Sequence, residues 1–200
     1  MTRDITRAIR STLVLWVLTA ILYPVLMLAV GQLVFPNQAN GSLLRNQQGQ
    51  VIGSALIGQP FRSDRYFNSR PSTTNYSTAN PKDDPAGLLK TGVSGASNLA
   101  PSNPALVDRV KENITALKQA GIAPTADLVY TSGSSLDPHI TLESAMAQVP
   151  RLAKVRNVNP NQLEMLISQH TDRRFLGIFG EPGVNVLQLN LALDALQPTS

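Results

Sequence analysis

The segment from Thr12 to Phe35 constrains this chain more than any other feature, because it is long, apolar and uncharged. No charged residue occurs between Ser11 and Leu44. As a helix, residues 12–35 would be about 36 Å long, enough to cross a hydrocarbon core of about 30 Å. Pro24 lies within this segment and favours a kink, which membrane helices tolerate where a neighbouring helix packs against the bend. The sequence therefore predicts one transmembrane helix.

The charges on the two sides of this helix are unequal. Arg3, Arg7 and Arg10 precede it, whereas the first cation after it is Arg45. Because positive charge is retained in the cytoplasm, the N-terminus is expected inside and the rest of the chain outside. The predicted organisation is a cytoplasmic flank (1–11), a transmembrane helix (12–35), a linker or exposed hairpin edge (36–50) and an extracytoplasmic domain (51–200). A cleaved secretory signal is less favoured, since its apolar region usually has only about 7–15 residues.

Composition excludes several functional classes for the outer domain. The chain has 17 basic and 13 acidic residues and no cysteine. Three of the basic residues precede the membrane segment, so the domain keeps only a small positive excess and has no basic run, which argues against nucleic-acid binding. The absence of cysteine excludes disulfides, thiolate nucleophiles and cysteine-ligated zinc.

Hydrophobic patterning predicts helices and strands interspersed along the domain. A strand is expected at 51–57, and the stretch 62–103, rich in Ser, Asn, Gly and Pro, is expected to be irregular. Asn103-Pro104 predicts a helix start and Gly121 its end. We also predict a strand at 127–131, a helix at 141–156 interrupted by Pro150, a helix beginning at Asn159-Pro160, and a strand at 184–194 where Leu alternates with polar residues. The predicted fold class is α/β, or mixed α+β.

The residues between Ser132 and Ile140 could suggest a hydrolytic site, because serines, Asp137 and His139 occur close together. No Gly-x-Ser-x-Gly motif is present, and Asp-Pro after a Ser/Gly run is typical of a turn before a helix. A structural turn is therefore favoured over catalysis, and a partner contact is the other alternative. His139 and His170 are far apart in the sequence and lack paired carboxylates, so no metal site is predicted. Glu181, in a Gly-Glu-Pro-Gly turn, is expected to accept hydrogen bonds.

The segment Gly92–Asn98 consists of small residues whose backbone N–H groups could surround an anion. It lacks the lysine and the spacing of a phosphate-binding loop, so this pattern alone is a weak indication of nucleotide binding.

Several separate motifs together resemble the C subunit of the Kdp-type potassium-transporting P-type ATPase family. These are the single N-terminal span, Tyr66-Phe67 with Arg70-Pro71-Ser72, Ser94-Gly95 with Ser97-Asn98-Leu99, Ser132-Gly133-Ser134 with Leu136-Asp137-Pro138-His139-Ile140, His170-Thr171, Gly180-Glu181-Pro182, and Val184–Leu187 with Leu189–Asp194. The resemblance covers essentially the whole chain.

This resemblance implies a non-catalytic subunit in the bacterial plasma membrane. Its implied partners are a potassium-translocating channel-like subunit, a P-type ATPase subunit, a small membrane subunit and membrane lipid. The family's nucleotide-binding segment would correspond here to Val93, Ser94, Gly95, Ser97 and Asn98, with Ala96 replacing the second glycine of the family pattern.

Two hypotheses follow, with a membrane-anchored hydrolase as a third. In the first, the chain is an assembly subunit whose outer domain covers the external ion entry, with partner contacts or loop structuring by Tyr66, Arg70, Ser132, Asp137 and His139. In the second, the chain is a catalytic chaperone that binds ATP and raises the ATP affinity of the ATPase subunit. It would need no other cofactor. The predicted topology favours the first, because an external domain does not meet cytoplasmic ATP.

Overall fold

The computed structural model describes residues 1–46, 48–78 and 92–196. The chain divides into two compact units, Met1–Leu43 and Leu44–Ser200. The part of the predicted irregular stretch at 79–91 lies outside the described residues.

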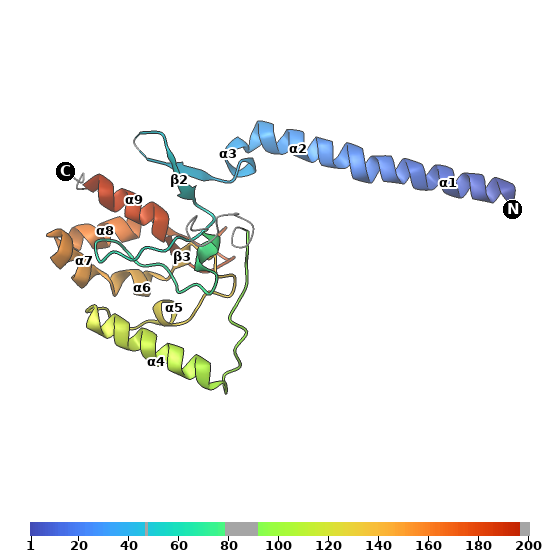
Figure 1. The fold of residues 1–200 in the computed structure, drawn as a ribbon. Helices are drawn as coiled ribbons and strands as arrows, with labels where there is room; N and C mark the ends of the chain where they lie inside the picture. Colours follow the sequence, from blue (N-terminus) through green and yellow to red (C-terminus); the bar gives the residue numbers. More distant parts are fainter. Residues whose placement is uncertain (47, 79–91, 197–200) are drawn as a thin grey trace. The chain divides into compact units, whose positions relative to one another are not determined.

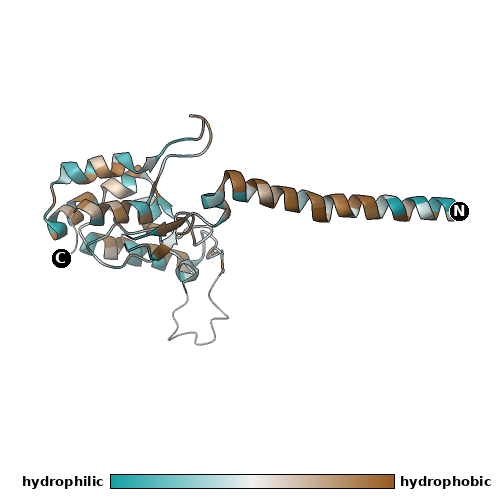
Figure 2. Cartoon of the chain, turned by 90° about the horizontal axis from the view of Figure 1, so that it is seen from above, coloured by the Kyte–Doolittle hydropathy of each residue, from teal (hydrophilic) through white to brown (hydrophobic). Residues whose placement is uncertain are grey.

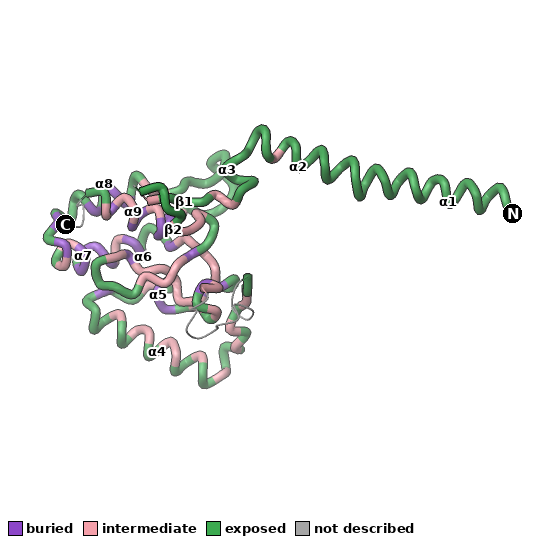
Figure 3. Tube along the Cα trace, turned by 45° about the horizontal axis from the view of Figure 1, so that its top comes forward, coloured by how far each residue is buried: buried purple, intermediate pink, exposed green. Residues whose placement is uncertain are grey.

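The first unit is a continuous helical run followed by a short turn of helix. α1 (Thr2–Val17), the π-helical turn η1 (Leu18–Leu22) and α2 (Tyr23–Val34) follow one another without a break, and α3 (Pro36–Ala39) comes next. No side chain of the continuous run is buried within the chain (Figure 3). The run of 33 residues is long and apolar enough to cross a membrane, and its hydrophilic beginning is visible in Figure 2. The predicted apolar helix is present, and the helical run begins at Thr2, before the apolar segment itself.

The π-helical turn accommodates Pro24. A proline lacks the N–H of an ordinary helical residue, and its ring collides with the carbonyl four residues earlier. Just before the proline, the Tyr23 N–H donates to the Leu18 carbonyl, five residues back. This wider turn keeps the helix continuous where proline would otherwise interrupt it.

The second unit contains two small antiparallel sheets and several helices (Figure 1). β1 (Leu43–Arg45) and β2 (Val51–Ser54) form a hairpin that includes the end of the 36–50 segment. The other sheet has the order β3-β5-β4, from His139–Ile140, Gly183–Asn185 and Thr171–Asp172. The remaining elements are η2 (Asn75–Ser77), α4 (Pro104–Gln119), α5 (Ala126–Val129), α6 (Leu142–Met146), α7 (Val149–Arg156), α8 (Pro160–Gln169) and α9 (Val186–Leu196).

The hydrophobic core lies among α6, α7, α8, α9 and β5, where the buried segments gather in Figure 3. Phe67 from the irregular 62–78 segment completes it. The helices predicted from Asn103-Pro104 and Asn159-Pro160 are confirmed as α4 and α8, because each Asn caps the helix through its side chain. The predicted helix at 141–156 is divided into α6 and α7, and Pro150 lies in the first turn of α7.

Side chains hold the 62–78 segment against the core in place of a neighbouring strand. The Asn190 amide accepts from the Phe67 N–H at 2.8 Å and donates to the Phe67 carbonyl at 3.0 Å. The Gln148 amide does the same for Asn68, at 2.7 and 3.2 Å. Because these four backbone groups are satisfied by side chains, the segment stays ordered without regular secondary structure.

One predicted strand is wrong, and another is correct only at its start. Residues 126–129 form the single helical turn α5, which buries the adjacent Leu128 and Val129, whereas a strand would point them to opposite faces. In the predicted strand 184–194, only Gly183–Asn185 pair as β5, and the chain continues as α9. Four of its five buried residues, Val186, Leu189, Asn190 and Leu193, have helical spacing, and packing against α8 selects the helix.

Candidate functional site

Arg70 is the centre of a charged cluster in the second unit. Its guanidinium Nη1 lies 3.2 Å from Asp137 Oδ2 and 3.7 Å from Asp127 Oδ1. The three side chains are only 15–31% exposed, so water screens these ion pairs less than it screens surface pairs. Arg70 thereby joins the irregular 62–78 segment to α5 and to the loop before β3.

Asp137 and His139 form a local turn beside Arg70. The His139 N–H donates to Asp137 Oδ1 at 3.0 Å, and the imidazole Nδ1 lies 3.7 Å from the same oxygen. The Asp137 carboxylate raises the pKa of His139 despite the opposing effect of burial, and Asp172 raises it further. Burial favours a higher pKa for Asp137, but hydrogen bonds from His139 and the charge of Arg70 outweigh it and lower that pKa.

The three-stranded sheet brings Asp172 to the other side of His139. His139 pairs with Asn185 and Asp172 with Gly183, which places their strands on either side of β5. His139 Nε2 lies 3.3 Å from Asp172 Oδ2. A Cβ on Gly183 would lie 3.2 Å from the His139 Cβ and 3.4 Å from its ring, so glycine leaves room for the imidazole.

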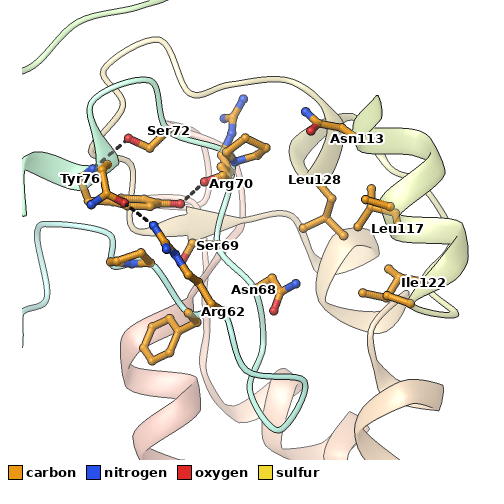
Figure 4. Close-up of a pocket in the computed structure, with 16 residues that line it drawn as sticks. Arg62, Asn68, Ser69, Arg70, Ser72, Tyr76, Asn113, Leu117, Ile122 and Leu128 are labelled. Carbon is orange, nitrogen blue, oxygen red and sulfur yellow. Dashed lines mark hydrogen bonds between the residues drawn. The ribbon is translucent and has the colours of Figure 1, made fainter. Parts of the chain in front are cut away.

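Two pockets share Arg70 as a lining residue. One, of about 350 Å³, is also lined by Asp127, Asp137, His139 and Asp172. The other, of about 520 Å³, lies between the 62–78 segment and α4 (Figure 4). Arg70 therefore borders both pockets, whereas the carboxylates and His139 border the smaller one.

The wall of the larger pocket contains a left-handed turn. Asn75, Tyr76 and Ser77 all have positive φ, a conformation that is costly for residues other than glycine. Ser72 Oγ accepts from the Tyr76 N–H at 2.9 Å, and the Tyr76 hydroxyl donates to the Arg70 carbonyl (Figure 4). Burial raises the pKa of Tyr76 to about 12, so the phenol stays a neutral donor to Arg70.

Two of the residues expected to bind nucleotide, Ser94 and Gly95, lie along the serine loop 132–135. The Gly95 N–H donates to the Ser134 carbonyl at 3.1 Å, and Ser94 Oγ donates to the same carbonyl at 3.0 Å. The Gly95 carbonyl accepts from Ser135 Oγ at 2.7 Å and from Thr73 Oγ1 at 2.9 Å. The Gly95 N–H therefore already has an acceptor and is not part of an open anion nest.

The other residues of that segment have separate contacts. Ser77 Oγ donates to the Val93 carbonyl, and Arg109 donates to Ser97 Oγ at 3.2 Å. Asn98 has a positive φ of 52°. Nucleotide binding by these residues stays a prediction.

The five residues expected to make partner contacts or structure loops fall into two groups. Arg70, Asp137 and His139 belong to the charged cluster, and Ser132 is connected to it through its N–H, which donates to the Pro71 carbonyl at 3.0 Å. Tyr66 belongs elsewhere, since its hydroxyl donates to Asp194 at 3.0 Å and its ring lies 4.8 Å from the Arg156 guanidinium carbon.

The serine hydroxyls of the 132–135 loop and the His139 imidazole have different partners. The serine hydroxyls bond to each other, to Thr73 and to Gly95, while the imidazole faces Asp137 and Asp172. Within the described parts of the chain, no group of three or more His, Asp or Glu side chains could hold a metal ion. Glu181 accepts from Arg174 at 2.8 Å, which confirms its expected role as an acceptor.

Sequence reasoning missed Asp127, Asp172, Tyr76 and Gly183. Asp127 is distant from Arg70 along the chain, and Asp172 is distant from His139. Only the tertiary fold and the strand register bring each pair close. Gly183 had a weak signal in the sequence, because it is the last residue of the Gly-Glu-Pro-Gly turn that precedes a predicted strand.

Comparison with known proteins places this sequence in a family. The model of the family described as "KdpC: K+-transporting ATPase, c chain" matches residues 5–195. The potassium-transporting ATPase KdpC subunit 1 of Nostoc sp. is 71% identical over 198 residues, covering 98% of each chain. The KdpC subunit of Microcystis aeruginosa is 65% identical over 209 residues, with 98% of each covered, and that of Geobacter sulfurreducens is 45% identical over 198 residues, covering 98% of this chain and 100% of its relative. The chain therefore belongs to the KdpC family of potassium-transporting ATPase subunits, and its apolar helix is that of a membrane-associated subunit.

Proposed function

We propose that this chain is a non-catalytic accessory subunit of a high-affinity, ATP-driven potassium uptake complex in the bacterial plasma membrane. In this proposal, the helix Thr2–Val34 packs against partner subunits in the membrane. The domain from Leu44 onward lies outside the cell, near the external entry of the ion pathway.

The charge asymmetry around the apolar helix carries this proposal. Arg3, Arg7 and Arg10 precede the uncharged stretch, and Arg45 is the first cation after it. The positive-inside rule then gives a cytoplasmic N-terminus and an external domain. The exposed apolar surface of the helix supports an assembly role, because in a bilayer it can contact both lipid and other helices.

Assembly is tested by deleting this chain and by purifying the complex through a tag on it. The expected results are loss of potassium uptake at low external potassium and copurification of a channel-like subunit and a P-type ATPase subunit. Normal transport by a stable complex that lacks the chain would contradict the accessory role.

Topology is tested separately with a single cysteine, which is unambiguous because the chain has none of its own. Lys118→Cys on α4 provides an exposed site in the domain, and Thr2→Cys is the matched control on the N-terminal flank. A membrane-impermeant maleimide should label position 118 in intact cells and position 2 only after permeabilisation.

The reverse labelling pattern would contradict the external placement. It would also give the predicted nucleotide residues, Val93 to Asn98, access to cytoplasmic ATP. The second hypothesis, a chaperone that raises the ATP affinity of the ATPase subunit, would then become the better explanation.

A further inference from the structure

The turn between β4 and β5 exposes four large apolar side chains in one place. Phe175, Leu176, Ile178 and Phe179 are 71, 73, 72 and 61% exposed. Single apolar residues on a surface are ordinary, but a contiguous group indicates an interaction site. We call residues 175–179 the apolar tip.

Four of the five backbone N–H groups of the apolar tip donate hydrogen bonds within the turn or to the residue before it. Phe175 and Phe179 donate to each other's carbonyls, at 2.8 and 3.0 Å. The Ile178 N–H donates to the Phe175 carbonyl at 3.2 Å, and the Gly177 N–H donates to the Arg174 carbonyl at 3.0 Å. These four N–H groups keep their partners when they leave water, which lowers the cost of entering an apolar phase.

Leu176 occupies a position of the turn where a leucine side chain is unfavourable. Leu176 and Gly177 have φ values of 53° and 74°, the pair of positive values found in type I′ turns. Asn, Asp or Gly is preferred at such positions, and an exposed Leu there gains nothing from packing within the domain. The leucine is therefore better explained by a contact outside the domain.

Lipid fits the apolar tip better than a protein surface does. A stable protein interface takes about 20–30 residues from each partner, whereas this group is one narrow turn. Arg173 and Arg174 precede the tip, and Arg174 also pairs with Glu181 at 2.8 Å. Apolar side chains next to arginines are typical of segments that enter the boundary between lipid headgroups and acyl chains.

The chain's own membrane helix brings a bilayer within reach. Residues 35–43 join the helical run to the second unit, and even fully extended they would span at most about 32 Å. A domain held this close meets the membrane at high effective concentration, so a weak contact is sufficient. We propose that the apolar tip inserts into the leaflet on the domain's side of the membrane, with Arg173 and Arg174 at the lipid phosphates.

This proposal needs the apolar helix in a membrane but not a particular side of that membrane, so it can fail without the proposed function failing. The test uses the full chain with the substitution Ile178→Cys, labelled with an environment-sensitive fluorophore and reconstituted into vesicles of phosphatidylcholine and phosphatidylglycerol. Lys118→Cys, also exposed, is the matched control. Iodide is supplied on both sides of the vesicles, because reconstitution gives both orientations.

The label at position 178 should be quenched by nitroxide-bearing lipid and should lose most of its quenching by iodide, while the label at 118 shows the opposite behaviour. Adding Leu176→Asn, which suits the positive φ of the turn, should restore part of the iodide quenching at 178 without lowering the urea midpoint of unfolding. This second substitution separates lipid contact from misfolding.

Three outcomes would overturn the proposal. The first is equal iodide quenching at 178 and 118 in vesicles. The second is shielding at 178 that Leu176→Asn leaves unchanged. The third is shielding that develops only when the partner subunits are present, because the tip would then contact a protein.

Discussion

At the residue scale, Asn190 shows how one buried amide can order an irregular segment. It satisfies both the N–H and the carbonyl of Phe67, and it is 2% exposed. Asn190→Leu is close in size but leaves two buried backbone groups without partners. We expect a loss of about 3 kcal/mol in the free energy of unfolding, measured by urea denaturation of the full chain in detergent.

The control for this substitution is Asn161→Leu in α8, where the side chain is exposed. It should change the free energy of unfolding by about 0.5 kcal/mol or less. Equal effects of the two substitutions would show that the contact with Phe67 does not support the fold.

The raised pKa of His139 predicts that the stability of the fold depends on pH. Its pKa is raised in the folded state by Asp137 and Asp172, so the protonated form is stabilised by folding. This contribution is fully present below the unfolded value of 6.5 and is lost as the pH rises through the higher folded pKa. The pKa of Asp137 is lowered, so its contribution is present above its unfolded value of 3.8 and is lost as the pH falls.

His139→Gln should therefore remove the decline in stability on the alkaline side of pH 6.5. It should also weaken the effect on the acid side, because the His139 side chain helps to lower the pKa of Asp137. Arg70 also faces Asp137, so the acid side depends on more than the histidine. The measurement is the urea midpoint of wild type and variant from about pH 5 to about pH 9, a range that brackets the titration of histidine. Parallel curves for the two proteins would show that His139 is not the group responsible.

At the scale of elements, the sequence predicts what local chemistry determines. α4 and α8 follow from an Asn cap before Pro, and α4 ends where Gly121 adopts a φ of 72°. The turn formed by Asp137 and His139 also follows from local chemistry, because the two residues are two positions apart in the sequence. Asp127 and Asp172 could not be predicted as their neighbours, because only the tertiary fold brings those carboxylates close.

α9 is the clearest case of a pattern with two interpretations. Leu187, Leu189, Leu191 and Leu193 alternate as in a strand, yet residues 186, 189, 190 and 193 also have helical spacing. The two interpretations differ at Leu191, which would share the buried face of a strand but is only partly buried in the helix. The sequence pattern is compatible with both interpretations, and tertiary packing selects the helix.

Alanine substitutions test this assignment. Leu189→Ala, at a fully buried position, should lower the free energy of unfolding by about 3 kcal/mol, and Leu191→Ala by clearly less. Leu196→Ala, at a 45% exposed position, should have the smallest effect. Equal losses at 189 and 191, measured by urea denaturation, would instead support a strand.

At the scale of the whole molecule, the chain combines a membrane helix with a domain that has its own core. Every residue of the hydrophobic core cluster belongs to the unit Leu44–Ser200. The helical run from Thr2 to Val34 contributes no buried side chain. A domain with a complete core is expected to fold without the segment that anchors it.

A fragment of residues 44–200 should therefore be soluble and should unfold with a free energy within about 0.5 kcal/mol of that of the same domain in the full chain. A second fragment, 60–200, is the informative comparison because it lacks the rest of the β1–β2 hairpin and the contacts after it. Asn185 then loses its bond to the Ala55 carbonyl, at 2.7 Å, and the Leu136 carbonyl loses the Gly58 N–H, at 2.8 Å.

The shorter fragment should be less stable by about 2–4 kcal/mol, because Asn185 is 2% exposed and its amide would lose its acceptor. Urea denaturation followed by circular dichroism measures both fragments. If 44–200 were unfolded, the membrane helix would be part of the domain's folding unit. If 60–200 were as stable as 44–200, the hairpin would act only as a connection, and the stability of the domain would rest on the helical core alone.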